Sequence, residues 1–164
     1  MIEKSTRENS NRESVWDYPR PPAIENVPQR IKILFNGEVI ADSINAKRVL
    51  ETSHPPTYYI PMEDIKREAL QSAPRRTWCE WKGQAEYFDV VIRDRVARSA
   101  GWYYPKPTSE YLEIKDHVAF YANKMDKCYV GDELVKPQKG DFYGGWITSN
   151  IDGPFKGGRG TSGW

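Results

Sequence analysis

Apolar side chains occupy every second position from Ile31 to Phe35, and the dipeptide Asn36-Gly37 follows them directly. A period of two is the pattern of a strand with one buried face, and Asn-Gly is favoured in the two-residue type I′ turns of β-hairpins. Apolar residues return at Val39 and Ile40. The pattern therefore predicts a hairpin over residues 31–43.

Two further stretches have a similar pattern. Residues 87–99 turn near Arg93-Asp94, and residues 127–136 turn at Gly131-Asp132. With three predicted hairpins, we expect a mainly β protein of the α+β class, built on an antiparallel β-hairpin core.

Two short stretches have apolar residues at helical spacing. They cover residues 62–70 and 109–118, and each follows an aromatic-proline segment, one ending at Pro61 and the other at Pro105. The two prolines lie 44 positions apart. We interpret the order of hairpin, aromatic-proline segment and short helix as an internal duplication, and expect two short helices.

The two ends of the chain differ from its middle. Residues 1–13 are charged and lack periodic apolar residues, which predicts a disordered tail. Residues 14–28 include a proline cluster that favours an extended segment, anchored in this interpretation by Trp16. Residues 140–164 hold eight of the twelve glycines, interleaved with aromatic residues, and are expected to wrap around the protein as a strap. At 164 residues, we expect one domain over residues 14–164.

The densest chemistry lies in residues 77–88, which we interpret as one strand interrupted at Gly83. With a period of two, Trp78, Glu80 and Lys82 would share one face. Burial of that face would lower the pKa of Lys82 and suit it to act as a base, a Schiff-base nucleophile or an anion anchor. The simpler alternative is a surface ion pair of Glu80 with Lys82.

Other candidate site residues lie elsewhere in the sequence, and their closeness to Lys82 and Glu80 is a hypothesis. His54 and His117 are the two histidines, and either could transfer protons near neutral pH, although a lone histidine is often structural. Four aromatic residues could stack on a planar or sugar-like ligand, with core packing as the alternative, which is favoured for Tyr121: Tyr58, Tyr59, Trp102 and Tyr121. We therefore list Lys82, Glu80, His117 and His54 as catalytic candidates. The ligand-binding candidates are Tyr58, Tyr59, Trp78, Trp102 and Tyr121.

The composition of the chain argues against several classes of binding partner. The formal net charge is +1, so no general field attracts nucleic acid or an anionic membrane. Without a long apolar run or a signal-peptide core, the chain is expected to be soluble and cytoplasmic, with Cys79 and Cys128 reduced. A zinc site would need these cysteines to converge with His54 and His117, so no metal and no cofactor are predicted.

Several longer motifs occur in one order along the chain: Glu13-Ser14-Val15-Trp16, the run from Ser53 to Pro61, Cys79-Glu80-Trp81-Lys82-Gly83, the run from Asp116 to Tyr121, and the run from Gly153 to Gly158. In these motifs the sequence closely resembles domain-of-unknown-function family 427. The resemblance implies a duplicated antiparallel core related to the β-tent fold. It supplies no activity. The family's nucleotidyltransferase-like label is discounted, because the Gly-Ser and Asp-x-Asp pattern of such enzymes is missing. The paired Cys-x-x-Cys motifs that hold zinc in many β-tent proteins are missing too.

The sequence thus predicts a domain that binds a small molecule in a semi-polar aromatic pocket around Lys82 and Glu80, with catalysis left open. The alternative is a non-catalytic module that docks a protein or peptide on an aromatic surface. A deep hollow at Lys82 would favour the first, and a flat exposed aromatic patch would favour the second. The oligomeric state stays open.

Overall fold

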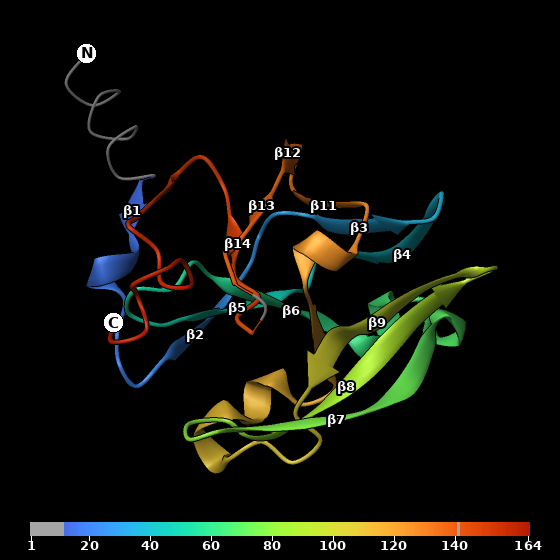
Figure 1. Ribbon diagram of the computed structural model, residues 1–164, viewed down its shortest axis with the longest axis horizontal. Coiled ribbons are helices and arrows are strands. Elements are labelled where there is room, and N and C mark those ends of the chain that lie inside the picture. Colours follow the sequence, from blue (N-terminus) through green and yellow to red (C-terminus); the bar gives the residue numbers. More distant parts are fainter. Residues whose placement is uncertain (1–11, 141) are drawn as a thin grey trace.

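The computed structural model describes residues 12–140 and 142–164, and its regular structure is mostly β (Figure 1). The strands are β1 (Glu13–Ser14), β2 (Ala23–Asn26), β3 (Ile31–Phe35), β4 (Glu38–Ser43), β5 (Lys47–Leu50), β6 (Thr57–Pro61), β7 (Leu70–Cys79), β8 (Gly83–Ile92), β9 (Arg95–Tyr103), β10 (His117–Phe120), β11 (Lys127–Val130), β12 (Glu133–Leu134), β13 (Lys136–Pro137), β14 (Trp146–Ile147) and β15 (Ile151–Asp152). Every helical segment in the described part of the chain is a short 3₁₀ helix: η1 (Val15–Asp17), η2 (Met62–Asp64), η3 (Arg67–Ala69), η4 (Ser109–Ile114) and η5 (Ala122–Lys124).

Two antiparallel sheets make up most of the structure. The larger has the strand order β2-β5-β6-β10-β9-β8-β7, and the smaller has the order β12-β11-β3-β4. A shared hydrophobic cluster joins them, with Ile33 and Phe35 from the smaller sheet against Ile60 and Phe120 from the larger. Burying each such side chain contributes roughly 1.5–3 kcal/mol, so this cluster is a main source of stability.

The three predicted hairpins are confirmed. Asn36 and Gly37 have φ values of 49° and 80°, as a type I′ turn requires, and they join β3 to β4. β8 and β9 are joined at Arg93-Asp94, and β11 and β12 at Gly131-Asp132. The mainly antiparallel β class is therefore correct, because local turn chemistry marked the point where each pair of strands reverses.

The predicted strand over residues 77–88 is instead a hairpin. β7 ends at Cys79, β8 begins at Gly83, and these two residues face each other in register. Gly83 has a φ of 107°, so it closes a three-residue turn rather than interrupting a strand. Glu80 and Lys82 therefore lie in the turn, where the alternation of strand faces does not apply.

The predicted helices are shorter than expected. Residues 62–69 contain η2 and η3, separated by Ile65 and Lys66, and the extended backbone of Ile65 ends η2. Residues 109–118 form η4, with a non-helical Tyr111, and the start of β10. Pairing of β10 with β6 and β9 accounts for the second difference, because tertiary pairing overrides helical spacing. β6 and β9, which carry most of the two aromatic-proline segments, lie on either side of β10.

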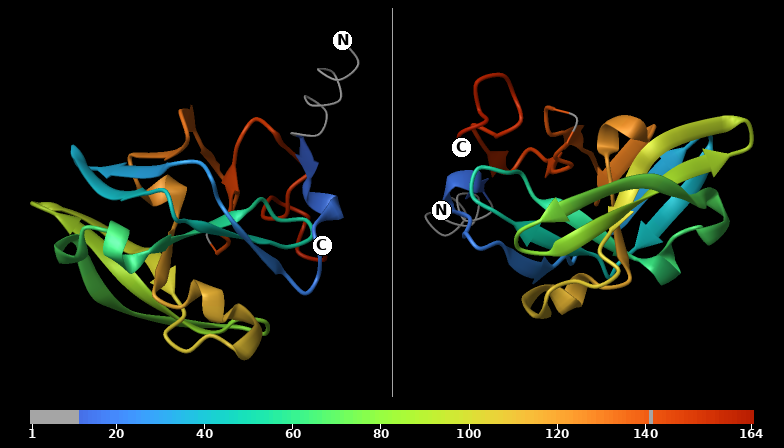
Figure 2. Two further views of the ribbon diagram at one scale, coloured as in Figure 1. Left: turned by 180° about the vertical axis from the view of Figure 1, so that it is seen from behind. Right: turned by 60° about the horizontal axis from the view of Figure 1, so that its bottom comes forward.

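The two ends of the described chain lie together. Glu13, expected in the tail, is the first residue of β1, which pairs in parallel with β15; the other tail residues up to 11 lie outside the described part. Val15 is fully buried and anchors this segment, whereas Trp16 is 42% exposed and packs edge-on against Trp164. Figure 2 shows the C-terminal segment in red beside the blue start of the described chain.

Trp146 fastens the C-terminal segment to the core. Its indole N–H donates to the carbonyl of Phe120 at 3.0 Å, and its ring stacks on Tyr58 at 5.1 Å between centroids. The side chain is fully buried. The segment is thereby held against the large sheet, where it forms one wall of the cavity described next.

Candidate functional site

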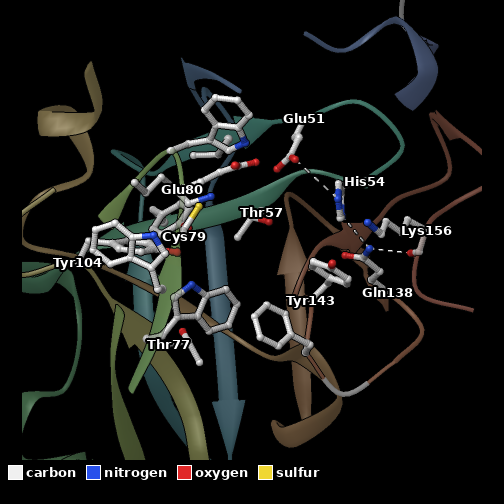
Figure 3. A pocket seen from close by; sticks show the side chains of 18 of the residues that line it. Glu51, His54, Thr57, Thr77, Cys79, Glu80, Tyr104, Gln138, Tyr143 and Lys156 are labelled. Atoms are coloured by element: carbon white, nitrogen blue, oxygen red, sulfur yellow. Dashed lines mark hydrogen bonds and ion pairs between the residues drawn. The ribbon is translucent and has the colours of Figure 1, made fainter. Parts of the chain in front are cut away.

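A cavity of about 570 Å³ opens beside the tip of the β7–β8 hairpin (Figure 3). Several parts of the chain line it, among them strands β5, β6 and β9, the loop after β5, the tip of the β7–β8 hairpin, the segment before β2 that holds Arg20, and the C-terminal segment. Its polar residues form two groups, and Figure 3 shows Cys79, Glu80 and Tyr104 on one side and His54, Gln138 and Lys156 on the other. Thr57 lies between the two groups.

Lys82 is the buried cation of this cavity. Its side chain is 9% exposed, and its Nζ lies 5.7 Å from the centroid of the Tyr104 ring. Two bonds hold the turn in place, because the Thr108 amide donates to the Lys82 carbonyl at 3.2 Å and the Thr108 hydroxyl donates to the Trp81 carbonyl at 2.6 Å. Within residues 12–140 and 142–164, no carboxylate oxygen comes within 4.0 Å of this ammonium.

The charge state of Lys82 differs from the sequence-based expectation. Burial lowers the pKa of Lys82, but interactions with Tyr59, Cys79 and Glu51 outweigh it, so the pKa is raised above its ordinary value. The expectation of a lowered pKa was wrong, because it ignored these neighbours. Lys82 is therefore an ammonium at neutral pH.

The carboxylate that acts on Lys82 is Glu51 rather than Glu80. Glu80 is exposed on the cavity rim and makes no ion pair with Lys82. Glu51 lies in the loop after β5, with its side chain 23% exposed and its Oε2 3.7 Å from Nε of Arg20. Sequence reasoning missed Glu51, although its position three residues before the rigid His54-Pro55-Pro56 run was a signal that it would be held in place.

His54 lies in the second group, buried against Tyr143 at 4.7 Å between ring centroids. Its Nδ1 is 3.1 Å from Nε2 of Gln138, and its Nε2 is 3.9 Å from Oε2 of Glu51. Burial, with smaller effects from Lys156, Arg20 and Lys82, lowers the pKa of His54 to about 4. His54 is therefore neutral at physiological pH. Gln138, missed at the sequence level, comes from the region just before the C-terminal segment and had no motif around it.

The other predicted residues divide between the cavity and its surroundings. Tyr59 and Trp102 are buried in the cavity wall, and Trp78 is 72% exposed on its rim. Three residues do not line it: His117, whose Nδ1 contacts the Lys115 carbonyl at 2.7 Å, Tyr58, which stacks on Trp146, and Tyr121, whose hydroxyl donates to the Phe142 carbonyl at 2.6 Å. These three have structural contacts and take no part in the proposal below.

The two cysteines are free thiols in different places. Cys79 is half-buried in the cavity, and Cys128 is buried in the core, where burial raises its pKa. The described residues contain no cluster of three or more histidine, cysteine or acidic side chains able to hold a metal. Nor do they contain a helix long and apolar enough to cross a membrane.

Comparison with known proteins gives a family but no activity. No curated protein matches the sequence. The family model described as a domain of unknown function, DUF427, matches residues 23–131. The matched region includes Glu51, His54 and the whole β7–β8 hairpin, and it ends before Gln138. The resemblance noted in the sequence is thereby confirmed, and the chain belongs to the DUF427 family.

Proposed function

We propose that the protein binds a small organic anion in the cavity, with the ligand's acidic group on the ammonium of Lys82. One observation carries the proposal: a buried cation borders an open cavity, and no carboxylate of the described residues is within 4.0 Å of it. A buried charge is costly unless it is paired, and a bound anion would provide the pair.

The other charges along the lining support an anion rather than a cation. Arg20, Lys82 and Lys156 line the cavity together with only two side-chain carboxylates, Glu51 and Glu80. Arg20 is offset by Glu51 at 3.7 Å, whereas the Nζ of Lys156 donates to a main-chain oxygen of Trp164 at 2.9 Å. The field inside the cavity therefore favours negative charge.

The walls favour a planar or ring-containing ligand. Tyr59, Trp102 and Tyr104 are buried in the lining, and rings of this kind present flat apolar faces with a polar edge. The volume of about 570 Å³ lies in the range of roughly 300–1,000 Å³ usual for small-molecule sites.

The protonation states support binding rather than acid–base catalysis. Lys82 is protonated at neutral pH, so it is not a general base or a Schiff-base nucleophile in this state. His54 is neutral, with its Nδ1 already in contact with Gln138, and His117 lies outside the cavity. The proposal is therefore a binding function, with no proton-transfer step assigned.

A second candidate is docking of a protein or peptide on the cavity rim. Trp78 is 72% exposed and Phe142 is 48% exposed, and both border the cavity. Large exposed aromatic residues are typical of interaction surfaces. This function would use the rim and would not need the ammonium of Lys82.

A thermal-shift screen against a metabolite library, followed by Lys82→Met, tests the main proposal. We expect acidic hits whose affinity falls about 10- to 100-fold in Lys82→Met, the value of one charge-assisted hydrogen bond. Lys127→Met is the matched control, because Lys127 is an exposed residue of β11 that does not line the cavity. Hits that bind Lys82→Met and Lys127→Met equally well, or a library without an acidic hit, would contradict the proposal.

A further inference from the structure

The second polar group of the cavity has a fixed hydrogen-bond pattern that starts at Gln138. The amide N–H of Gly145 donates to Oε1 of Gln138 at 3.0 Å, and Nε2 of Gln138 donates to the carbonyl of Lys156 at 2.7 Å. A backbone N–H can only donate and a backbone carbonyl can only accept. These two contacts therefore fix which end of the amide is oxygen and which is nitrogen.

The orientation of Gln138 fixes the tautomer of His54. The amide nitrogen of Gln138 carries only donors, so Nδ1 of His54, 3.1 Å away, must be the acceptor. A neutral imidazole with an unprotonated Nδ1 carries its single proton on Nε2. His54 therefore presents an N–H donor on the side of the ring that faces Glu51.

The separation of His54 and Glu51 leaves room for one bridging atom. Nε2 of His54 and Oε2 of Glu51 are 3.9 Å apart, which is beyond the roughly 2.7–3.2 Å of an N–H···O bond. An oxygen about 2.9 Å from both atoms would complete the pair. It would have to accept a hydrogen from His54 and donate one to the Glu51 carboxylate.

Few functional groups can do both. A hydroxyl has one donor and two acceptor positions, whereas a carbonyl or ether oxygen cannot donate and an ammonium cannot accept. We infer that the ligand carries a hydroxyl group that bridges His54 and Glu51 while its acidic group lies on Lys82. This deepens the proposed function and rests on it: the ligand class is a hydroxylated organic acid with a planar body.

The tautomer can be tested in the protein without any ligand. The chain has only two histidines, so ¹⁵N-detected ring correlations give two patterns, and His117→Asn removes one of them to assign the other. We expect His54 as the Nε2–H tautomer at pH 7. In Gln138→Glu the new carboxylate would accept from the ring, and we expect a proton on Nδ1. An Nδ1–H tautomer or an imidazolium in the parent protein would overturn the inference.

The hydroxyl requirement is tested with matched pairs of acids. The probes are 4-hydroxybenzoate, 4-hydroxyphenylacetate and 3-(4-hydroxyphenyl)propionate, each beside its partner without the hydroxyl group, in calorimetric titrations. We expect the best hydroxylated acid to bind at least 10-fold tighter than its partner, because a site built for a hydroxyl discriminates against its loss. That ratio should fall to about one in His54→Phe and persist in His117→Asn.

Glu51→Ala gives the same test with a partly exposed side chain, so the inference does not depend on how well His54→Phe folds. Probes that bind equally with and without the hydroxyl, yet lose affinity in Lys82→Met, would overturn the hydroxyl bridge and leave anion binding standing. If acidic library hits bind but none of the six probes does, the ligand class is wrong. If neither the probes nor the library acids bind, both the hydroxyl bridge and the proposed function are contradicted.

Discussion

The ammonium of Lys82 lies 5.7 Å from the centre of the Tyr104 ring, and interactions with Tyr59, Cys79 and Glu51 raise its pKa above the ordinary value. A cation held over an aromatic face keeps only part of the stabilisation it has in water. The Lys82 side chain is buried, with only 9% of its surface exposed. The raised pKa means that contacts in the folded protein stabilise the charged form of Lys82 by more than burial destabilises it.

The substitution Lys82→Met should therefore weaken ligand binding without a large change in folding stability. Methionine fills similar space without a charge, so we expect the lost charge interactions and the relieved cost of burial to offset each other, and the free energy of unfolding to change by less than about 1 kcal/mol. Urea denaturation measures this, with Lys127→Met as the reference. A loss of stability of more than about 1 kcal/mol, set against the typical effect of a core substitution, would show that the ammonium has a structural role instead.

His54 should make the protein less stable in mild acid. Its folded-state pKa is lowered to about 4, whereas the unfolded chain takes up the proton near pH 6.5. The contribution is fully present above about pH 6.5 and is lost as the pH falls toward 4. Between pH 7 and pH 5 we expect a loss of about 2 kcal/mol in the free energy of unfolding.

Urea denaturation at half-unit pH steps checks this prediction. The window ends at pH 5, because carboxylates with lowered pKa values, such as Glu13 and Asp42, begin to lose their contributions below it. His54→Asn should flatten the profile and His117→Asn should not. The same slope in parent protein and His54→Asn would assign the effect to another group.

Gly157→Ala should loosen the C-terminal wall of the cavity. Gly157 has a φ of 120°, and a Cβ there would lie 2.0 Å from the backbone oxygen of Lys139. We expect a loss of about 2 kcal/mol or more in the free energy of unfolding, because backbone must move. Gly163→Ala is the control, since a Cβ at Gly163 meets nothing within 4 Å. Equal melting temperatures of the two variants would contradict this packing.

The hairpins could be predicted because their signals are local. The dipeptide Asn36-Gly37 indicates a type I′ turn by itself, and apolar and polar residues alternate within a few positions of it. The β7–β8 hairpin was missed because Gly83, the only turn signal in its run, is equally compatible with a bulge. That error gave Lys82 the wrong partner, Glu80, although Lys82 does line the cavity.

The second half of the site could not be predicted from sequence. Glu51 and Gln138 meet at His54 only after β5, β6 and the β13–β14 pair have packed together. No motif connects residues so far apart in the chain, and their distances depend on tertiary structure. His117 looked equally promising because residue type alone cannot separate a histidine in a cavity from one that contacts the backbone carbonyl of Lys115.

Titration of an acidic hit, followed through the indole N–H signals of the tryptophans in ¹⁵N-labelled protein, tests the central claim most directly. Trp81 and Trp102 line the cavity, Trp78 lies on its exposed rim, and Trp146 is buried in the core as an internal reference. If the ligand binds inside, the signals of Trp81 and Trp102 should shift in the parent protein and should need about 10- to 100-fold more ligand to shift in Lys82→Met, whereas the Trp146 signal should not move. A shift confined to Trp78, or the same shifts at the same ligand concentrations in Lys82→Met, would contradict anion binding at Lys82.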